Sequence, residues 1–217
     1  MAQLRGDSRV GQFVIVQIDL VKVQIMKFDP SIVQTRIQTP LGEMCLAATA
    51  QGLAGAWFID QRHRPQGMDF ESLPHAWPRQ DAHPTLVQAG REMQEYFDGK
   101  RHVFDVDLDI NGGTLFQQFV WRALLKIAHG KTSTYGDIGR QINNPAAVRA
   151  VGSAVGRNPL SIIIPCHRVL GGDGSLTGYA GGLHRKTALL NLEGVAFAGN
   201  MASSKSTSTF NPTPSLF

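Results

Sequence analysis

The stretch SIIIPCHRV, residues 161–169, is the most informative part of this chain. Its three successive isoleucines predict a short buried strand. Pro165 removes a backbone donor and fixes φ, so we expect the strand to end there and the next side chain to be held in a set direction. That side chain is Cys166, followed by His167 and Arg168. An isolated cysteine is most often an inert core residue, but a base and a permanent cation beside the thiol favour thiolate chemistry.

These residues resemble the active-site signature of the O6-alkylguanine-DNA alkyltransferases, DNA repair proteins that are consumed by their own reaction. The hexamer IPCHRV carries the resemblance, and further blocks follow the order of the family. The blocks are FQQFVW at 116–121, TYG at 134–136, RAVG at 149–152, NP at 158–159, GYAGG at 178–182 and LEG at 192–194. A Pro-Cys-His triplet alone is a weak signal, whereas this ordered set is a strong one.

The resemblance implies an α+β fold with two domains. It predicts a small N-terminal ribonuclease H-like α/β domain at 32–110, without the catalysis of that enzyme. A winged helix-turn-helix domain is predicted at 111–195. The residue pattern is consistent with the first domain, because alternation over 32–60 predicts an antiparallel meander and helical spacing predicts a helix over 84–97.

Residues 103–110 alternate apolar residues with three aspartates, which predicts a half-exposed strand. The aspartates raise the alternative of a metal site. A solvated strand face explains them better, because residues two apart line one face of a strand.

The second half predicts a series of short helices. Thr114 caps an amphipathic helix that Gly130 stops, and a second helix is expected over 135–142. Asn144 caps and Pro145 opens a third helix that runs to about residue 155. The strand at 162–164, a glycine-rich hairpin and a final helix over 183–192 complete the prediction.

The two ends of the chain lie outside the resemblance. Residues 1–31 match nothing in the family. They form an extra segment in which 14–21 predicts a strand, or translation begins at Met26 and the first 25 residues are a gene-model artefact. Residues 196–217 are rich in Ser, Thr, Pro and Asn and predict a disordered tail.

Composition limits the classes of protein that fit. The chain has 217 residues and 42% hydrophobic content, enough for one large core or two small ones. Its apolar runs are too short to span a bilayer and its start lacks a secretory signal, so we expect a cytoplasmic, nucleoid-associated protein and no membrane partner. Two cysteines allow at most one disulfide, which favours a reducing compartment. No Cys/His set has structural-zinc spacing, so neither metal nor cofactor is expected.

The charge is distributed unevenly. Residues 1–110 carry 11 basic and 14 acidic side chains, whereas residues 111–195 carry nine basic and three acidic ones. A segregated positive charge suggests that the second half meets a polyanion, although an ordinary solvated surface is the alternative.

Four residues are candidates for the chemistry of alkyl transfer. Cys166 is the nucleophile, and His167 is the adjacent base, which we expect to take the thiol proton through a bound water. The resemblance assigns to Glu193 the other imidazole N–H, as the acid does in a triad. A carboxylate at a helix C-terminus is otherwise electrostatically misplaced. Tyr135 is the candidate proton donor to the departing base, with a packing aromatic as the alternative.

The resemblance also implies how DNA is bound. Arg149 lies among small residues on the third helix, so that the helix can approach the minor groove and the arginine can hold the place of an extruded guanine. A lone solvated arginine is the alternative. Ala150 and Thr134 complete the expected DNA-binding residues.

Further residues are expected to shape the substrate pocket. Asn158 tethers the turn to the active site, Pro165 frames the cysteine, and the carbonyl of Val169 accepts from the guanine amino group. The lip of the pocket is expected at Tyr179, Ala180 and Gly181. Some relatives have serine where this chain has Ala180, so backbone N–H groups must replace that hydroxyl.

The sequence therefore predicts DNA repair by stoichiometric, irreversible transfer of an alkyl group from O6-alkylguanine, and from O4-alkylthymine, to Cys166. The expected partner is double-stranded DNA bound by a monomer. Two alternatives are a winged-helix regulator without chemistry and an alkylation sensor. The intact Cys166 argues against the first, and the absence of an additional cysteine-bearing sensor domain argues against the second. A cysteine hydrolase is disfavoured because no distant base constellation is found.

Overall fold

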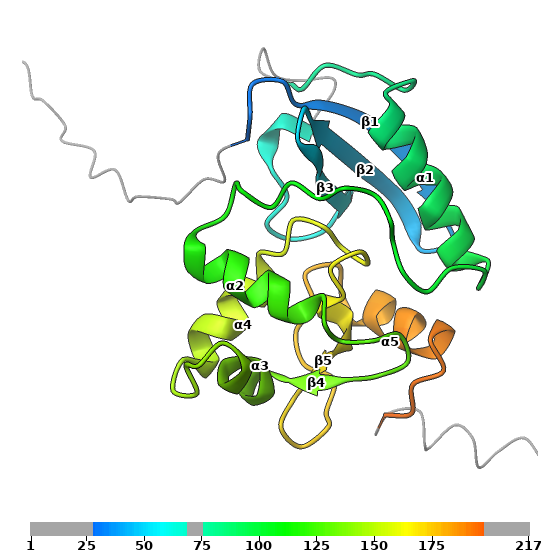
Figure 1. Cartoon of the computed structure of the whole chain (residues 1–217). Coiled ribbons are helices and arrows are strands. Elements are labelled where there is room, and N and C mark those ends of the chain that lie inside the picture. The colour runs from blue at the N-terminus through cyan, green and yellow to red at the C-terminus, as the bar shows by residue number, and fades with distance from the viewer. Residues whose placement is uncertain (1–27, 69–75, 198–217) are drawn as a thin grey trace, which may run out of the picture.

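The computed structural model describes residues 28–68 and 76–197. A three-stranded sheet with α1 beside it forms one part of the molecule, and helices α2–α5 form the other (Figure 1). The antiparallel sheet has the order β1-β2-β3, with β1 at Val33–Thr39, β2 at Gly42–Thr49 and β3 at Gly52–Phe58. The predicted meander is therefore present.

Both faces of this sheet are covered. Along β2, Met44 and Leu46 belong to the large core that α1 (Pro84–Phe97) joins, whereas Cys45 and Ala47 belong to a second cluster. This two-sided burial follows from the side-chain period of two along a strand. The second cluster also includes Trp57 and Met68, the last residue of the short 3-10 helix η1 (Gln66–Met68).

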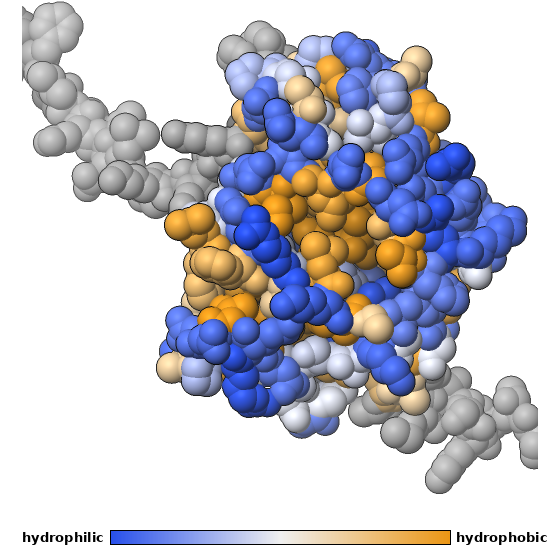
Figure 2. Space-filling view, in the orientation of Figure 1, coloured by the Kyte–Doolittle hydropathy of each residue, from blue (hydrophilic) through white to orange (hydrophobic). Residues whose placement is uncertain are grey.

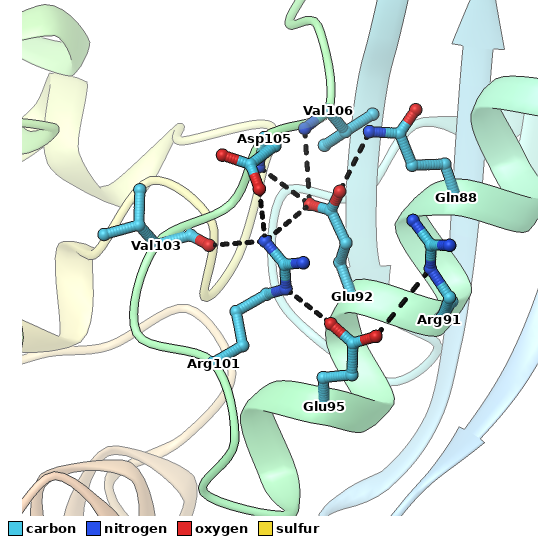
Figure 3. A network of polar contacts seen from close by, with 8 residues as sticks. All are labelled: Gln88, Arg91, Glu92, Glu95, Arg101, Val103, Asp105 and Val106. Atoms are coloured by element: carbon cyan, nitrogen blue, oxygen red, sulfur yellow. Dashed lines mark hydrogen bonds and ion pairs between the residues drawn. The ribbon is translucent and has the colours of Figure 1, made fainter.

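The segment after α1 is anchored by a buried carboxylate. Glu92, 1% exposed, accepts hydrogen bonds from the backbone N–H groups of Asp105 (2.8 Å) and Val106 (3.2 Å) (Figure 3). Nη1 of Arg101 lies 3.8 Å from the same carboxylate. The strand predicted over 103–110 is wrong, because only an isolated parallel bridge between Leu108 and Leu53 forms here. Within the described residues, no group of three or more His, Cys, Asp or Glu could hold a metal ion.

The second part begins with α2 (Leu115–Leu124). Thr114 caps it as predicted, in a reciprocal capping box with Gln117. The remaining elements are β4 (Ser133–Thr134), α3 (Tyr135–Gln141), α4 (Val148–Gly156), the 3-10 helix η2 (Cys166–Arg168), β5 (Val169–Leu170) and α5 (Leu183–Leu192). Strand β4 pairs in parallel with β5, so the turn that carries the cysteine is linked to the start of α3. The expected α+β class is confirmed.

Three expectations about this half or its end are wrong in detail. Helix α4 begins at Val148 after Ala147, not at Pro145, and Asn144 does not cap it. Residues 162–164 form a turn rather than a strand, because Ile162 adopts a φ of 75° that no strand contains. Phe197 lies within the segment predicted as a disordered tail, yet it is 4% exposed and packs with Leu190 and Val195. The strand expected at 14–21, the alternative start at Met26 and residues 198–217 lie outside the described residues.

The two parts share one core and several backbone hydrogen bonds. The N–H of Ala56 in β3 donates to the carbonyl of Pro159 (2.9 Å), and the N–H of Ser161 donates to the carbonyl of Ala56 (2.8 Å). Apolar side chains gather between the two parts on the face shown in Figure 2, ringed by polar ones. No helix within the described ranges is long and apolar enough to cross a bilayer.

Candidate active site

Cys166 is presented by a tight turn. Its backbone N–H donates to the carbonyl of Ile164 at 2.7 Å, and its side chain is 5% exposed. The side-chain amide of Asn158 donates to Sγ at 3.0 Å and to the carbonyl of Ile164 at 2.8 Å. Asn158 therefore links the turn to the thiol. Burial raises the pKa of the Cys166 thiol, against the opposing effect of the Asn158 hydrogen bond, so the thiol rests protonated and needs a base.

His167 is oriented by Glu193. Nε2 of His167 lies 2.8 Å from Oε1 of Glu193, and both side chains are fully buried. Burial lowers the pKa of His167 despite the opposing effect of Glu193, so the resting imidazole is neutral. Because Nε2 carries the proton that faces the carboxylate, Nδ1 keeps its lone pair. Nothing among the described residues hydrogen-bonds the buried Nδ1. This nitrogen is thus available as a base.

The Glu193 carboxylate is a hub with four partners. Arg168 binds it through Nε (2.8 Å to Oε2) and Nη2 (2.9 Å to Oε1), and the hydroxyl of Tyr96 donates to Oε1 at 2.8 Å. The N–H of Gly130 donates to Oε2 at 3.3 Å. Burial alone would raise the pKa of the Glu193 carboxyl, but His167 and Arg168 hold it well below its ordinary value. The carboxylate is therefore charged at all physiological pH values.

Sequence reasoning missed Tyr96 and the second role of Arg168. Tyr96 comes from α1, 97 residues before Glu193, and no local pattern links the two. Burial and the charge of Glu193 raise the pKa of the Tyr96 hydroxyl, so it acts as a donor. The first part of the chain therefore contributes directly to the hub.

A pocket of about 190 Å³ opens at the predicted lip, and Cys166, His167 and Glu193 are not among the residues that line it. Tyr135, Gly152 and Val155 line it together with Tyr179 and Ala180. The Tyr135 hydroxyl accepts a hydrogen bond from Thr177 Oγ1 at 3.3 Å. The predicted lip residues thus lie together. Gly181 adjoins them, and its Cβ position would be 2.8 Å from the Tyr179 ring, so any side chain there would displace that ring.

Lys186 is a second residue that the sequence did not single out. Its fully buried Nζ donates to the carbonyl of Val169 (2.5 Å) and to that of Thr177 (2.8 Å). Burial lowers its pKa to about 8, against the opposing effect of Cys166. Lys186 therefore holds in place the carbonyl of Val169 that the sequence assigned to substrate.

The remaining predicted residues are divided between the surface and the interior. Arg149 and Ala150 are exposed on α4, which packs against α2. Thr134 is the N-cap of α3, in a capping box with Asp137, so it has a structural role as well. Pro165 precedes η2 with a φ of −78°. Cys45, by contrast, is sealed in the sheet, where burial raises its pKa to about 12.

Comparisons with known proteins agree with this arrangement. A model described as the 6-O-methylguanine DNA methyltransferase ribonuclease-like domain matches residues 32–110, and the model of the DNA binding domain matches 115–195. The chain belongs to the 6-O-methylguanine DNA methyltransferase family.

Individual relatives are similar over most of the chain. A methylated-DNA--protein-cysteine methyltransferase of Mycobacterium tuberculosis is 45% identical over 157 residues, which span 72% of this chain and 89% of the relative. An inducible methyltransferase of the same name from Bacillus subtilis is 44% identical over 151 residues, 68% of this chain and 82% of the relative. The crystal structure of M. tuberculosis OGT in complex with DNA has a TM-score of 0.65 and 43% identity, and the match covers 74% of this chain and 92% of that one.

Proposed function

We propose that this protein repairs DNA by transferring an alkyl group from O6 of guanine to the sulfur of Cys166. The observation that carries the proposal is the neutral His167, which follows in the chain a thiol that needs a base. Its Nε2 is held by Glu193, and its Nδ1 has no hydrogen-bond partner among the described residues. It is supported by the family membership and by relatives named methylated-DNA--protein-cysteine methyltransferase. DNA binding is supported by the M. tuberculosis relative in complex with DNA.

The reaction moves one proton along the hub and one alkyl group to sulfur. His167 takes the thiol proton through a water, and Glu193, itself held in place by Arg168, stabilises the imidazolium that forms. The thiolate attacks the alkyl carbon, the carbon–oxygen bond breaks, and a thioether forms on Cys166. The electron pair of the broken bond stays on the guanine, which takes a proton from the Tyr135 hydroxyl to become neutral. No step of the proposed reaction removes the alkyl group from this thioether, so each molecule reacts once.

Recognition of the base falls to the pocket. The Val169 carbonyl, fixed by Lys186, accepts a hydrogen bond from the guanine amino group. Backbone N–H groups near Ala180 donate hydrogen bonds to O6 of the guanine. O4-alkylthymine presents a similar alkyl-oxygen group and is a second substrate. The residues contain all the groups that the reaction requires, so neither metal nor cofactor enters it.

Binding to the duplex falls to α4. Its exposed Arg149 and the small residues around it, including Ala150, suit close approach to the minor groove of double-stranded DNA by a single copy of the protein. Arg149 fills the gap that the extruded nucleotide leaves. A protein with this substrate works where the chromosome is, and we therefore place it in the cytoplasm on the nucleoid.

We infer that the chain consists of two domains that meet between residues 110 and 111. Residues 32–110 form the ribonuclease-like domain, and residues 111–195 carry the acceptor cysteine and the DNA-binding helix. The segments 1–31 and 196–217 flank this repair unit.

A single experiment tests the proposal. The protein is incubated with a duplex that contains O6-methylguanine, digested, and analysed by mass spectrometry. We expect one added methyl group on the peptide that contains Cys166, and none on the peptide that contains Cys45. A protein that leaves the lesion intact, or that carries the methyl group elsewhere, would refute the assignment.

A further inference from the structure

One wall of the pocket comes from the ribonuclease-like domain. The loop that follows β3 places Arg62 and His63 in the lining of the 190 Å³ cavity, beside Tyr135 and Ala180. The backbone N–H of Arg62 donates to the carbonyl of Ala180 at 3.0 Å, so the loop is attached to the lip itself.

The neighbouring residues fix this loop on both sides. Ser161 Oγ donates to the buried Oε1 of Gln61 at 3.0 Å. Arg185 forms an ion pair with Asp60 at 2.8 Å and donates to the carbonyl of Gly181 at 3.0 Å. The wall is therefore a built part of the pocket, held by both the active-site turn and α5.

The side chains of Arg62 and His63 remain available at the mouth. Both are exposed, and within the described ranges the Arg62 guanidinium has no hydrogen bond or ion pair. The carboxylate nearest in sequence, Asp60, is engaged by Arg185. His63 has a φ of 61°, a conformation that non-glycine residues adopt seldom and at positions with a special constraint.

The size of the pocket determines which part of a nucleotide these two side chains can contact. About 190 Å³ is below the range of about 300–1,000 Å³ typical of sites for whole drug-sized ligands. In the proposed reaction the alkylated base enters this pocket, and the sugar and the phosphate of the extruded nucleotide stay at its mouth. A guanidinium presents a planar pair of donors that matches a phosphate group.

We propose that Arg62 and His63 of the ribonuclease-like domain bind the phosphate group adjoining the extruded alkylated nucleotide. The domain that lacks the DNA-binding helix thus forms part of the substrate site. This inference rests on the proposed alkyl transfer and adds to it a phosphate-binding subsite supplied by a different domain from the one that contains α4.

The test uses the smallest substrates that contain or lack the phosphate. Transfer to the full-length protein is measured from O6-methyl-2′-deoxyguanosine, from its 5′-monophosphate and from its 3′-monophosphate, by mass spectrometry of the Cys166 peptide. We expect the wild type to react about three- to tenfold faster with one monophosphate than with the nucleoside, as for one partly exposed charged contact. The preferred monophosphate identifies which phosphate is bound.

Variants of the loop then test whether Arg62 and His63 cause the faster transfer from the monophosphate. In Arg62→Ala the ratio of the nucleotide rate to the nucleoside rate should fall close to one, and Arg62→Lys should keep part of it. His63→Ala should reduce the ratio less. Arg122→Ala, which removes an exposed arginine of α2 outside the pocket, is the matched control and should keep the wild-type ratio. With duplex DNA, Arg62→Ala should lower the slope of log affinity against log salt by about one unit.

Two different failures are distinguishable. Equal wild-type rates for the nucleoside and both nucleotides, or an advantage that survives the Arg62→Ala/His63→Ala double substitution, would overturn the phosphate site alone. Absence of transfer from methylated duplex DNA to wild-type protein would overturn the proposed function and this inference with it.

Discussion

Replacing Glu193 by glutamine should weaken both the fold and the chemistry. The carboxylate accepts from His167, Tyr96 and Gly130, and it neutralises Arg168, which is 6% exposed. The glutamine side chain carries no charge. Its NH2 group replaces one accepting carboxylate oxygen and faces other donors. Breaking a buried ion pair by removing one partner destabilises a protein by about 3–5 kcal/mol. We expect a loss of this size in the free energy of unfolding at pH 7.

The loss of stability in Glu193→Gln should become smaller as the pH falls. The pKa of Glu193 is held below its unfolded value of 4.5, so its contribution is complete above about pH 4.5 and disappears as the pH falls towards the folded value. The difference between wild type and Glu193→Gln should therefore narrow below about pH 4.5. Burial lowers the pKa of His167 from 6.5, which destabilises both proteins as the pH falls below 6.5, so the comparison rests on the difference.

A matched substitution separates the fold from the chemistry. Glu92 is also a buried carboxylate with several donors, but it holds the 101–106 segment rather than the active site (Figure 3). Glu92→Gln should also destabilise the protein, whereas its transfer rate per folded molecule should stay within about twofold of wild type. Glu193→Gln should slow transfer by about a hundredfold or more, as expected for loss of the group that orients a general base.

Urea unfolding followed by tryptophan fluorescence at several pH values, together with single-turnover transfer, measures both effects. A Glu193→Gln protein as stable as wild type, or a stability difference that is constant from pH 7 to pH 3, would refute the ion-pair argument. Equal slowing in the two variants would show that the rate follows general stability and not the hub.

Further predictions address single residues. Cys166→Ser should abolish transfer and leave duplex affinity within a few fold, and label that still moves to the serine variant would rule out this acceptor. His167→Ala combined with Glu193→Gln should be no slower than the worse single variant, since one proton path is broken only once; multiplied losses would indicate two paths. Arg149→Ala should slow repair of duplex DNA but not reaction with a free O6-alkylated guanine base, and Arg149→Lys should recover part of the duplex rate; equal slowing on both substrates would remove the extrusion role. Tyr96→Phe should lower the transfer rate by a few fold and destabilise the protein by about 1 kcal/mol, measured as above; an unchanged rate and stability would show that its hydrogen bond to Glu193 is dispensable.

The local pattern of the sequence predicted the elements that local physics decides. Helix α1 has the predicted bounds, and the Thr114 cap follows from a side chain that satisfies nearby N–H groups. The turn at 162–164 was mistaken for a strand, because a short run of buried isoleucines has the same composition in either state. Residues 103–110 have the alternation of a strand but lack a full partner strand, so they do not form one.

The active site was predictable only where its residues share a motif. Cys166 and His167 are adjacent, and Glu193 lies in a recognisable block near the end of a helix. Tyr96 and Lys186 reach the site through tertiary packing, and no spacing of residues in the sequence predicts such contacts. Arg62 reaches the pocket only because β3 is hydrogen-bonded to the Pro159–Ser161 segment, which is a property of the folded chain.

The hydrogen bonds of Ala56 limit how the two domains of this protein can be separated or exchanged. The hydrogen bonds of Ala56 to Pro159 and Ser161 cross the boundary between the domains, and so does the bond from Tyr96 to Glu193. A fragment that began at residue 111 would keep the acceptor cysteine but expose the apolar surface on which β3 lies, and its Glu193 would lose one of its donors. We therefore expect the second domain to lose its repair function when it is cut out and fused to another protein. Any exchange of the first domain, by recombination or by an engineer, must bring with it a strand and a tyrosine in the same places.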